Sequence, residues 1–136
     1  MFLVHIFILS SFAQHPFSTL TINAVHFKNY QGNVVANIFR EQDEMPKKPW
    51  KIMRGKIIAG KSTIVFENIP FGEYAVILYH DENSNEVLDH KLFLPAEPMG
   101  FSNGWKLTLF SGMPSFENLR FVFSEQLQEL TIALDE

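Results

Sequence analysis

The 136-residue sequence contains no cysteine, and its basic residues do not outnumber its acidic ones. The lack of cysteine excludes disulfide bonds and thiolate sites, whether for a metal or for a nucleophile. With 11 Lys and Arg against 15 Asp and Glu, the formal net charge is −4. Nucleic acids and anionic membranes are bound through basic surfaces, so we expect neither as a partner. The sequence also lacks long amphipathic helical patterns, internal repeats and low-complexity tracts.

Apolar residues, in contrast, are plentiful. They make up 46% of the chain, and phenylalanine alone occurs 14 times. This composition supplies a sizeable core and argues against disorder. The length fits one domain, which we expect over residues 14–136. Without disulfides, the stability of this domain must come from its core or from a bound ion.

The first residues have the features of an export signal. Residues 1–12 read MFLVHIFILSSF, an apolar run with no acidic residue that is too short to span a bilayer. Ser11-Phe12-Ala13 follows the spacing that signal peptidases recognise, so we predict a signal peptide over residues 1–13. A buried first strand is the alternative, because short apolar runs are ambiguous. The signal peptide predicts a periplasmic or secreted protein with no transmembrane segment in the mature chain.

The segment Tyr74–Tyr79 is the most strand-like part of the chain. It is apolar on both faces, as expected for a central strand, with Val76 and Leu78 facing one layer and Ile77 the other. Tyr74 directly follows a Pro-Phe-Gly turn. We expect its hydroxyl to bond back to that turn as a tyrosine corner.

The remaining segments of strand length are separated by turn residues. We expect further strands at Thr19–Phe27, Val34–Arg40, Trp50–Ile58, Ser62–Glu67, Trp105–Phe110, Arg120–Ser124 and Leu130–Leu134. The segment Lys91–Leu94 is expected to be a short strand or a linker, Glu41–Pro49 and Pro95–Gly100 irregular, and Phe116–Leu119 one helical turn. A fold of about seven short strands at these spacings is an all-β, antiparallel β-sandwich.

A loop rich in potential ligands follows the central strand. The side chains of Asp81, Asn83, Asn85 and Asp89 and the carbonyl group of Val87 occupy alternate positions. This is the spacing at which a Ca²⁺ loop presents its oxygen ligands. The usual glycine and the final glutamate of such a loop are replaced by Glu86 and Leu92. The pattern therefore predicts at most a weak calcium site, with Kd of about 10⁻⁴ to 10⁻³ M. The alternative is a polar loop whose Asp and Asn side chains bond to their own backbone.

Two further patterns carry weaker hypotheses. His80 and His90 flank the loop, and a transition metal held by both is conceivable, although their spacing matches no common zinc motif. Gly100-Phe101-Ser102-Asn103-Gly104 has the letters of a nucleophile elbow, but a strand-like segment follows it and no histidine occurs after His90. The alternative is a glycine-bounded loop with Phe101 packed beneath it.

Four motifs in order resemble the DUF2141 family of small exported bacterial proteins. They are Ile69–Val76, the loop His80-Asp81-Glu82-Asn83 with Asn85 and Leu88-Asp89, Glu97–Asn103, and Pro114–Glu117. The resemblance covers about Leu20 to the C-terminus, and it implies an Ig-like, prealbumin-like sandwich with no assigned activity. The family usually has glycine where Ser84 stands, and often where Glu86 stands, so this loop is expected to be less flexible.

These observations favour an exported, non-enzymatic module that binds an unknown protein or small ligand through loops at one end of the sandwich. The expected ligand-binding residues are His80, Gly100, Phe101, Ser102 and Asn103. One alternative is a small periplasmic hydrolase on a transthyretin-like fold, although the C-terminal Tyr-Arg-Gly-Ser of hydroxyisourate hydrolase is missing. Another is a structural module stabilised by the weak calcium site.

Overall fold

The computed structural model describes residues 16–91 and 94–135, so the predicted signal peptide lies outside the described residues. The described strands are β1 (Phe17–Val25), β2 (Asn33–Phe39), β3 (Lys51–Lys56), β4 (Ser62–Pro70), β5 (Gly72–Asp81), β6 (His90–Lys91), β7 (Leu94–Pro95), β8 (Met99–Phe101), β9 (Phe121–Phe123) and β10 (Glu129–Ala133). A 3-10 turn η1 (Ser102–Gly104) and one α-helical turn α1 (Phe116–Leu119) complete the chain. The all-β prediction is confirmed, and in this described part no helix is long and apolar enough to cross a membrane.

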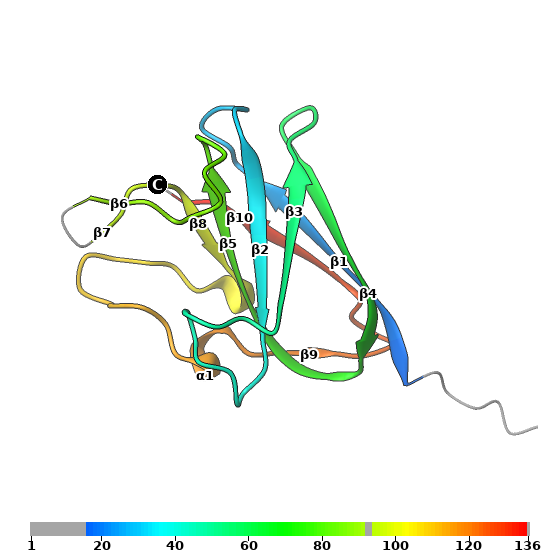
Figure 1. Cartoon of the computed structure of the whole chain (residues 1–136). Coiled ribbons are helices and arrows are strands. Elements are labelled where there is room, and N and C mark those ends of the chain that lie inside the picture. The colour runs from blue at the N-terminus through cyan, green and yellow to red at the C-terminus, as the bar shows by residue number, and fades with distance from the viewer. Residues whose placement is uncertain (1–15, 92–93, 136) are drawn as a thin grey trace, which may run out of the picture.

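The strands form two main sheets that face each other (Figure 1). The smaller sheet has the order β10-β1-β4, and the larger has the order β3-β2-β5-β8, with β9 also pairing with β5. The pairing of β1 with β10 is parallel, whereas the other ladders of these sheets are antiparallel. β6 and β7 form a small separate hairpin.

The prediction for the central strand is confirmed. β5 pairs with β2 on one side and with β8 and β9 on the other. Val76 and Leu78 lie in the core between the two sheets, and Ile77 lies in a second core on the other face of the larger sheet. The Tyr74 hydroxyl donates to the Pro70 carbonyl oxygen at 2.7 Å, so the predicted tyrosine corner is also present.

The segment 102–120 covers the outer face of the larger sheet (Figure 1), and here the sequence prediction fails in part. Trp105–Phe110 alternates like a strand but is an irregular loop. Trp105 and Leu107 pack against the second core, whereas Leu109 and Phe110 are exposed. Trp105 and Leu107 thus alternate with polar residues because one side of this loop lies on the sheet. Among the described residues, no neighbouring strand pairs with the segment. The prediction of irregular chain up to Gly100 missed β8, which is only three residues long.

Candidate functional site

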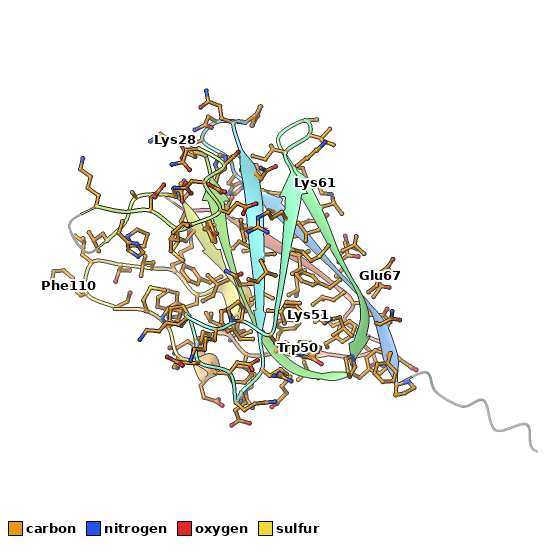
Figure 2. The ribbon with its side chains drawn as sticks, viewed as in Figure 1. Lys28, Trp50, Lys51, Lys61, Glu67 and Phe110 are labelled. Atoms are coloured by element: carbon orange, nitrogen blue, oxygen red, sulfur yellow. The ribbon has the colours of Figure 1, made fainter. Side chains whose placement is uncertain are left out.

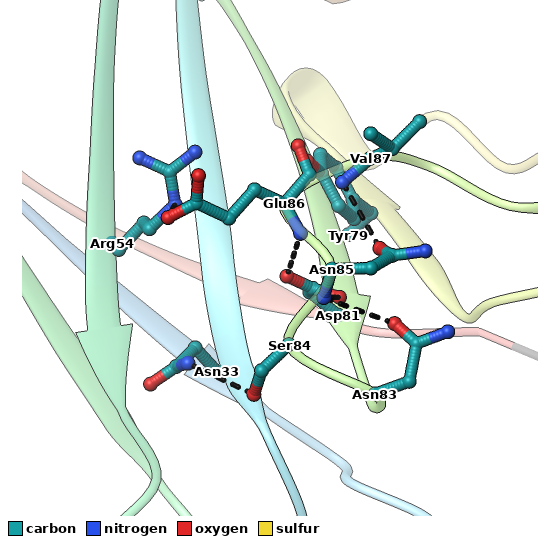
Figure 3. A network of polar contacts seen from close by, with 9 residues as sticks. All are labelled: Asn33, Arg54, Tyr79, Asp81, Asn83, Ser84, Asn85, Glu86 and Val87. Carbon is teal, nitrogen blue, oxygen red and sulfur yellow. Dashed lines mark hydrogen bonds and ion pairs between the residues drawn. The ribbon is translucent and has the colours of Figure 1, made fainter.

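The loop after β5 is built around the carboxylate of Asp81. The strand continues through His80 and Asp81, beyond the expected end at Tyr79, and Asp81 is buried. Its two carboxylate oxygens accept hydrogen bonds from the backbone N–H of Asn85 at 3.1 Å and of Glu86 at 2.9 Å (Figure 3). Ser84 and Glu86 both have positive φ, which lets the chain curl around this carboxylate. Asp81 therefore fixes the shape of the loop.

Side-chain amides complete the loop. Asn83 Oδ1 accepts from Asn85 N at 3.2 Å, and Asn85 Oδ1 accepts from Val87 N at 3.1 Å (Figure 3). The amide nitrogens of Asn83 and Asn85 donate to the Asp89 carboxylate at 2.7 and 3.0 Å. The two bonds from backbone N–H groups to the side-chain oxygens of Asn83 and Asn85 are the Asx-type bonds that the alternative interpretation predicts. The structure thus brings Asp81, Asn83, Asn85 and Asp89 together as a hydrogen-bonded loop.

A turn before β2 holds the start of the loop in place. Gly32 has φ +70°, and a Cβ on it would lie 1.9 Å from the Asp81 carbonyl oxygen, so only glycine fits. Asn29 Nδ2 donates to the Glu82 carboxylate at 3.1 Å, and Asn33 Nδ2 donates to the Ser84 hydroxyl at 3.3 Å (Figure 3). The loop therefore rests on the β1–β2 connection as well as on its own strand.

Glu97 lies between β7 and β8, and it was named in the sequence analysis only within a motif of the family resemblance. Its carboxylate is buried and accepts from the backbone N–H of Glu82 at 3.1 Å and of Asp89 at 3.2 Å. Burial raises its pKa above the usual range, and the negative charges of Asp89 and Asp81 raise it further, while the two backbone hydrogen bonds lower it. Glu97 thus ties both ends of the loop to the segment before β8.

The donor set does not fit a calcium ion as it stands. Both aspartate carboxylates of the loop already accept N–H groups, and the amide nitrogens of Asn83 and Asn85 point toward Asp89. Over residues 16–91 and 94–135, no group of three or more His, Asp or Glu side chains is arranged to hold a metal ion. A cation would require both amides to turn their oxygens toward it.

The two histidines do not converge. His80 is buried in the sandwich, where its Nε2 bonds to the Gln31 carbonyl oxygen and its ring lies edge-on to Phe27 at 5.3 Å between centroids. His90 is exposed in β6. Strand alternation explains the difference, because His80 follows Val76 and Leu78 on the inner face of β5.

The residues Gly100–Asn103 serve the packing of the outer core. Gly100 lies against β10, where a Cβ would come within 2.8 Å of the Ala133 carbonyl oxygen. Phe101 is buried edge-on to Trp105 at 4.8 Å between centroids, as the sequence predicted for a residue beneath this loop. Asn103 is exposed and donates to the Asn118 carbonyl oxygen at 3.2 Å.

Ser102 joins three elements through its buried hydroxyl. The oxygen accepts from Val76 N at 2.9 Å and donates to the Leu119 carbonyl oxygen at 2.6 Å. Ser102 is 1% exposed and is the first residue of the three-residue turn η1, whereas the serine of a nucleophile elbow is followed by a helix. Its geometry is that of a brace between β5, η1 and α1.

A groove of about 430 Å³ opens on the outer face of the larger sheet, and no local sequence pattern indicated it. Its floor is formed by Asn37, Ile52, Ile77 and Tyr79 of the sheet. One wall is the loop, through Glu86, Val87, Leu88 and His90, and the rest includes Pro46, Lys47, Pro49, Met99 and Met113. The Tyr79 hydroxyl donates to the Glu86 carbonyl oxygen at 3.3 Å, which fixes the wall to the floor. Burial, followed by the charge of Asp81, raises the pKa of Tyr79, so its phenol is neutral at pH 7.

Fold and loop together define a small β-sandwich in which a polar loop borders an apolar groove. The chain belongs to the DUF2141 family, described as an uncharacterized protein conserved in bacteria, whose model matches residues 22–131. No curated protein and no solved structure matches the chain.

Proposed function

We propose that this protein is an exported, non-enzymatic binding module whose ligand lies in the outer-face groove, with the Asp81–Asp89 loop as one wall. The observation that carries the proposal is the groove itself. Its volume of about 430 Å³ falls within the usual size of small-molecule sites. Its lining is mainly apolar, with a few polar groups at its edge, as such sites generally are. Export is supported by the apolar run at residues 1–12.

The lining indicates the kind of ligand. Ile77, Met99 and Leu88 offer apolar contact, while Lys47, Glu86 and His90 provide charged or polar groups of both signs. A compact, largely apolar molecule with one polar end fits a groove whose lining combines these apolar and charged side chains. The rigid hydrogen bonds around Asp81 support binding, because a wall that is already ordered loses little entropy when the ligand enters.

Titration with the amphiphilic fluorescent dye anilinonaphthalene sulfonate, an apolar ring system with one anionic end, tests the proposal. Val87 is 60% exposed and Met113 is 41% exposed, so Val87→Asp and Met113→Asp should leave the fold intact. We expect each to weaken dye binding about tenfold, because a charge is placed in the apolar lining. Val122, 56% exposed on β9 and outside the groove, provides the matched control Val122→Asp. Equal binding by all three variants would reject the groove as the site.

A weak calcium site in the loop is a second proposal, with Glu97 as the residue that would supply the oxygen that position 92 lacks. Both Glu97 carboxylate oxygens accept backbone N–H groups, from Glu82 and Asp89, so binding requires at least one of these bonds to open and the Asn83 and Asn85 amides to turn. Millimolar Ca²⁺ should then add on the order of 1 kcal/mol to the free energy of unfolding. Calorimetry in calcium and in chelator measures this, with Asp89→Asn as the variant that removes the increment. Coincident melting curves would leave the loop as a hydrogen-bonded turn.

A further inference from the structure

The strand β3 is an exposed edge of the larger sheet. Among the described strands it pairs with β2 alone, and Figure 1 shows it separating from β4 as the two run toward the Trp50 end. Ile52 and Met53 are 49% and 42% exposed. Because alternate residues of an edge strand point their N–H and C=O groups away from the sheet, β3 offers unpaired backbone groups beside exposed apolar side chains.

A second groove lies where β3 and β4 diverge. Its volume is about 420 Å³, and it lies between Lys51, Ile52 and Met53 on one side and Val65, Phe66 and Glu67 on the other. Figure 2 shows Lys51 and Glu67 on the two strands that bound it. β4 is likewise an edge of its own sheet, since its described ladder is with β1. The open side of the sandwich is therefore a slot with a free strand along its margin.

The charge around this slot differs from that of the rest of the chain. Residues 45–66 contain six basic residues and no acidic one, which leaves five basic and fifteen acidic residues elsewhere. The six are Lys47, Lys48, Lys51, Arg54, Lys56 and Lys61. Lys47 and Lys48 contact Glu44, and Arg54 contacts Glu86 at 3.7 Å. A negative protein still gathers more than half of its basic residues on one strand and its flanks. The same charge disfavours a second copy pairing edge to edge, because an antiparallel β3–β3 ladder would bring the basic residues of the two strands together, with Arg54 opposite Arg54 when the ladder is centred there.

The two faces of β3 carry different chemistry. Met53 pairs with Ala36, and Gly55 with Val34, so these residues and Lys51 face the slot. Ile52, Arg54 and Lys56 face the outer side. Glu67 stands across the slot and disfavours an acidic group there, whereas Arg54 and Lys56 favour one on the outer side.

We propose that the β3 edge binds an extended segment of a partner protein in which acidic and apolar residues alternate. The segment adds a strand beside β3, principally along Lys51–Arg54, because the side chains of Ser62 and Ile64 already press against Gly55. Its apolar side chains enter the slot beside Met53 and Val65, and its acidic side chains lie beside Arg54 and Lys56. This surface is separate from the outer-face groove, with Ile52 bordering both.

The probe is the labelled peptide acetyl-Glu-Val-Glu-Val-Glu-Val-amide, followed by fluorescence polarisation. Two N-methylated forms, substituted at the Glu or at the Val nitrogens, separate strand pairing from attraction between charges. Only the residues that face β3 donate to its edge, so we expect one form to lose about tenfold or more in affinity and the other to retain it. Equal affinities for the two N-methylated forms would overturn the proposal, because they would show binding by charge alone. An affinity for the polyanion dextran sulfate equal to that for the unmodified peptide would overturn it for the same reason.

Charge-reversal variants test the location. We expect Arg54→Glu with Lys56→Glu to weaken peptide binding about tenfold, and more at low salt. Lys91→Glu with Lys106→Glu, at exposed positions elsewhere, changes the net charge equally and should retain binding within about twofold. Equal losses for the two pairs would overturn the proposal. Lys56→Glu alone, which leaves the ion pair between Arg54 and the groove residue Glu86 intact, should still bind the amphiphilic dye, so failure of this inference is distinguishable from failure of the outer-face groove.

Discussion

The two faces of the larger sheet are both buried, but by different means. The inner face packs against β1 and β4 through regular strands, with Leu20, Ile22, Val76 and Leu78 all fully buried. The outer face is covered by loops, and the side chains of Ser102, Asp81 and Glu97 hold the chain around it by accepting hydrogen bonds from backbone N–H groups. The packing of sheet on sheet leaves an opening at its margin, between β3 and β4, whereas the loop cover leaves a groove on the face itself.

The largest expected effect comes from the inner face. Leu78→Ala should cost toward the upper end of about 2–5 kcal/mol in the free energy of unfolding, because Leu78 lies between two rigid sheets that cannot collapse into the cavity. Ile77→Ala, on the outer face beside the groove, should cost toward the lower end of the same range. Urea unfolding of the two variants measures the difference. A larger loss for Ile77→Ala would mean that the loop cover is the more rigid of the two.

Substitution of Ser102 tests how far the outer cover, meaning the loops on the outer face of the larger sheet, depends on buried hydrogen bonds. Ser102→Ala leaves Val76 N and the Leu119 carbonyl oxygen without their buried partner, which should cost about 1–3 kcal/mol. Asn103→Gly, one residue along, exposed and at a φ of 59° that glycine adopts freely, should cost well below that in the same urea experiment. A fluorophosphonate should not label Ser102, because its hydroxyl is buried and donated to a carbonyl group. Covalent labelling of Ser102 would favour the hydrolase alternative.

Glu97 gives the loops that cover the outer face a pH dependence. Its raised pKa means that the folded state keeps a proton over a pH range in which the unfolded chain has lost it. The free energy of unfolding should therefore fall as pH rises from the ordinary carboxyl pKa through the raised value.

Urea unfolding at pH values from about 4 to 7 compares the protein with Glu97→Gln, which should show a shallower decline. The exposed Glu125→Gln serves as the control and should follow the unmodified protein. A decline of the same steepness in Glu97→Gln would assign the effect to another group.

The inner face could be predicted from the sequence and the outer face largely could not. The apolar alternation of Thr19–Phe27 and Ser62–Glu67 corresponds to β1 and β4, because strand period and burial agree wherever sheet packs on sheet. The loop after β5 was predicted from its Asp and Asn spacing, including the Asx-turn alternative. Its tie to Glu97 and the groove that it borders depend on contacts between distant segments, which periodicity does not encode.

The smallest effect is expected at the tip of the covering loop. Phe110 is 98% exposed and Leu109 is 76% exposed, although the same alternating segment buries Trp105 and Leu107 in part. Phe110→Ser should change the free energy of unfolding by less than about 0.5 kcal/mol, because the side chain leaves no cavity behind. Phe101→Ala, at a buried position of the same outer core, should cost about 3–5 kcal/mol by the same measurement. A loss at Phe110 approaching that at Phe101 would mean that the loop tip folds back onto the sheet in solution. The outer cover would then be tighter than its groove indicates, and the contrast between the two faces would narrow.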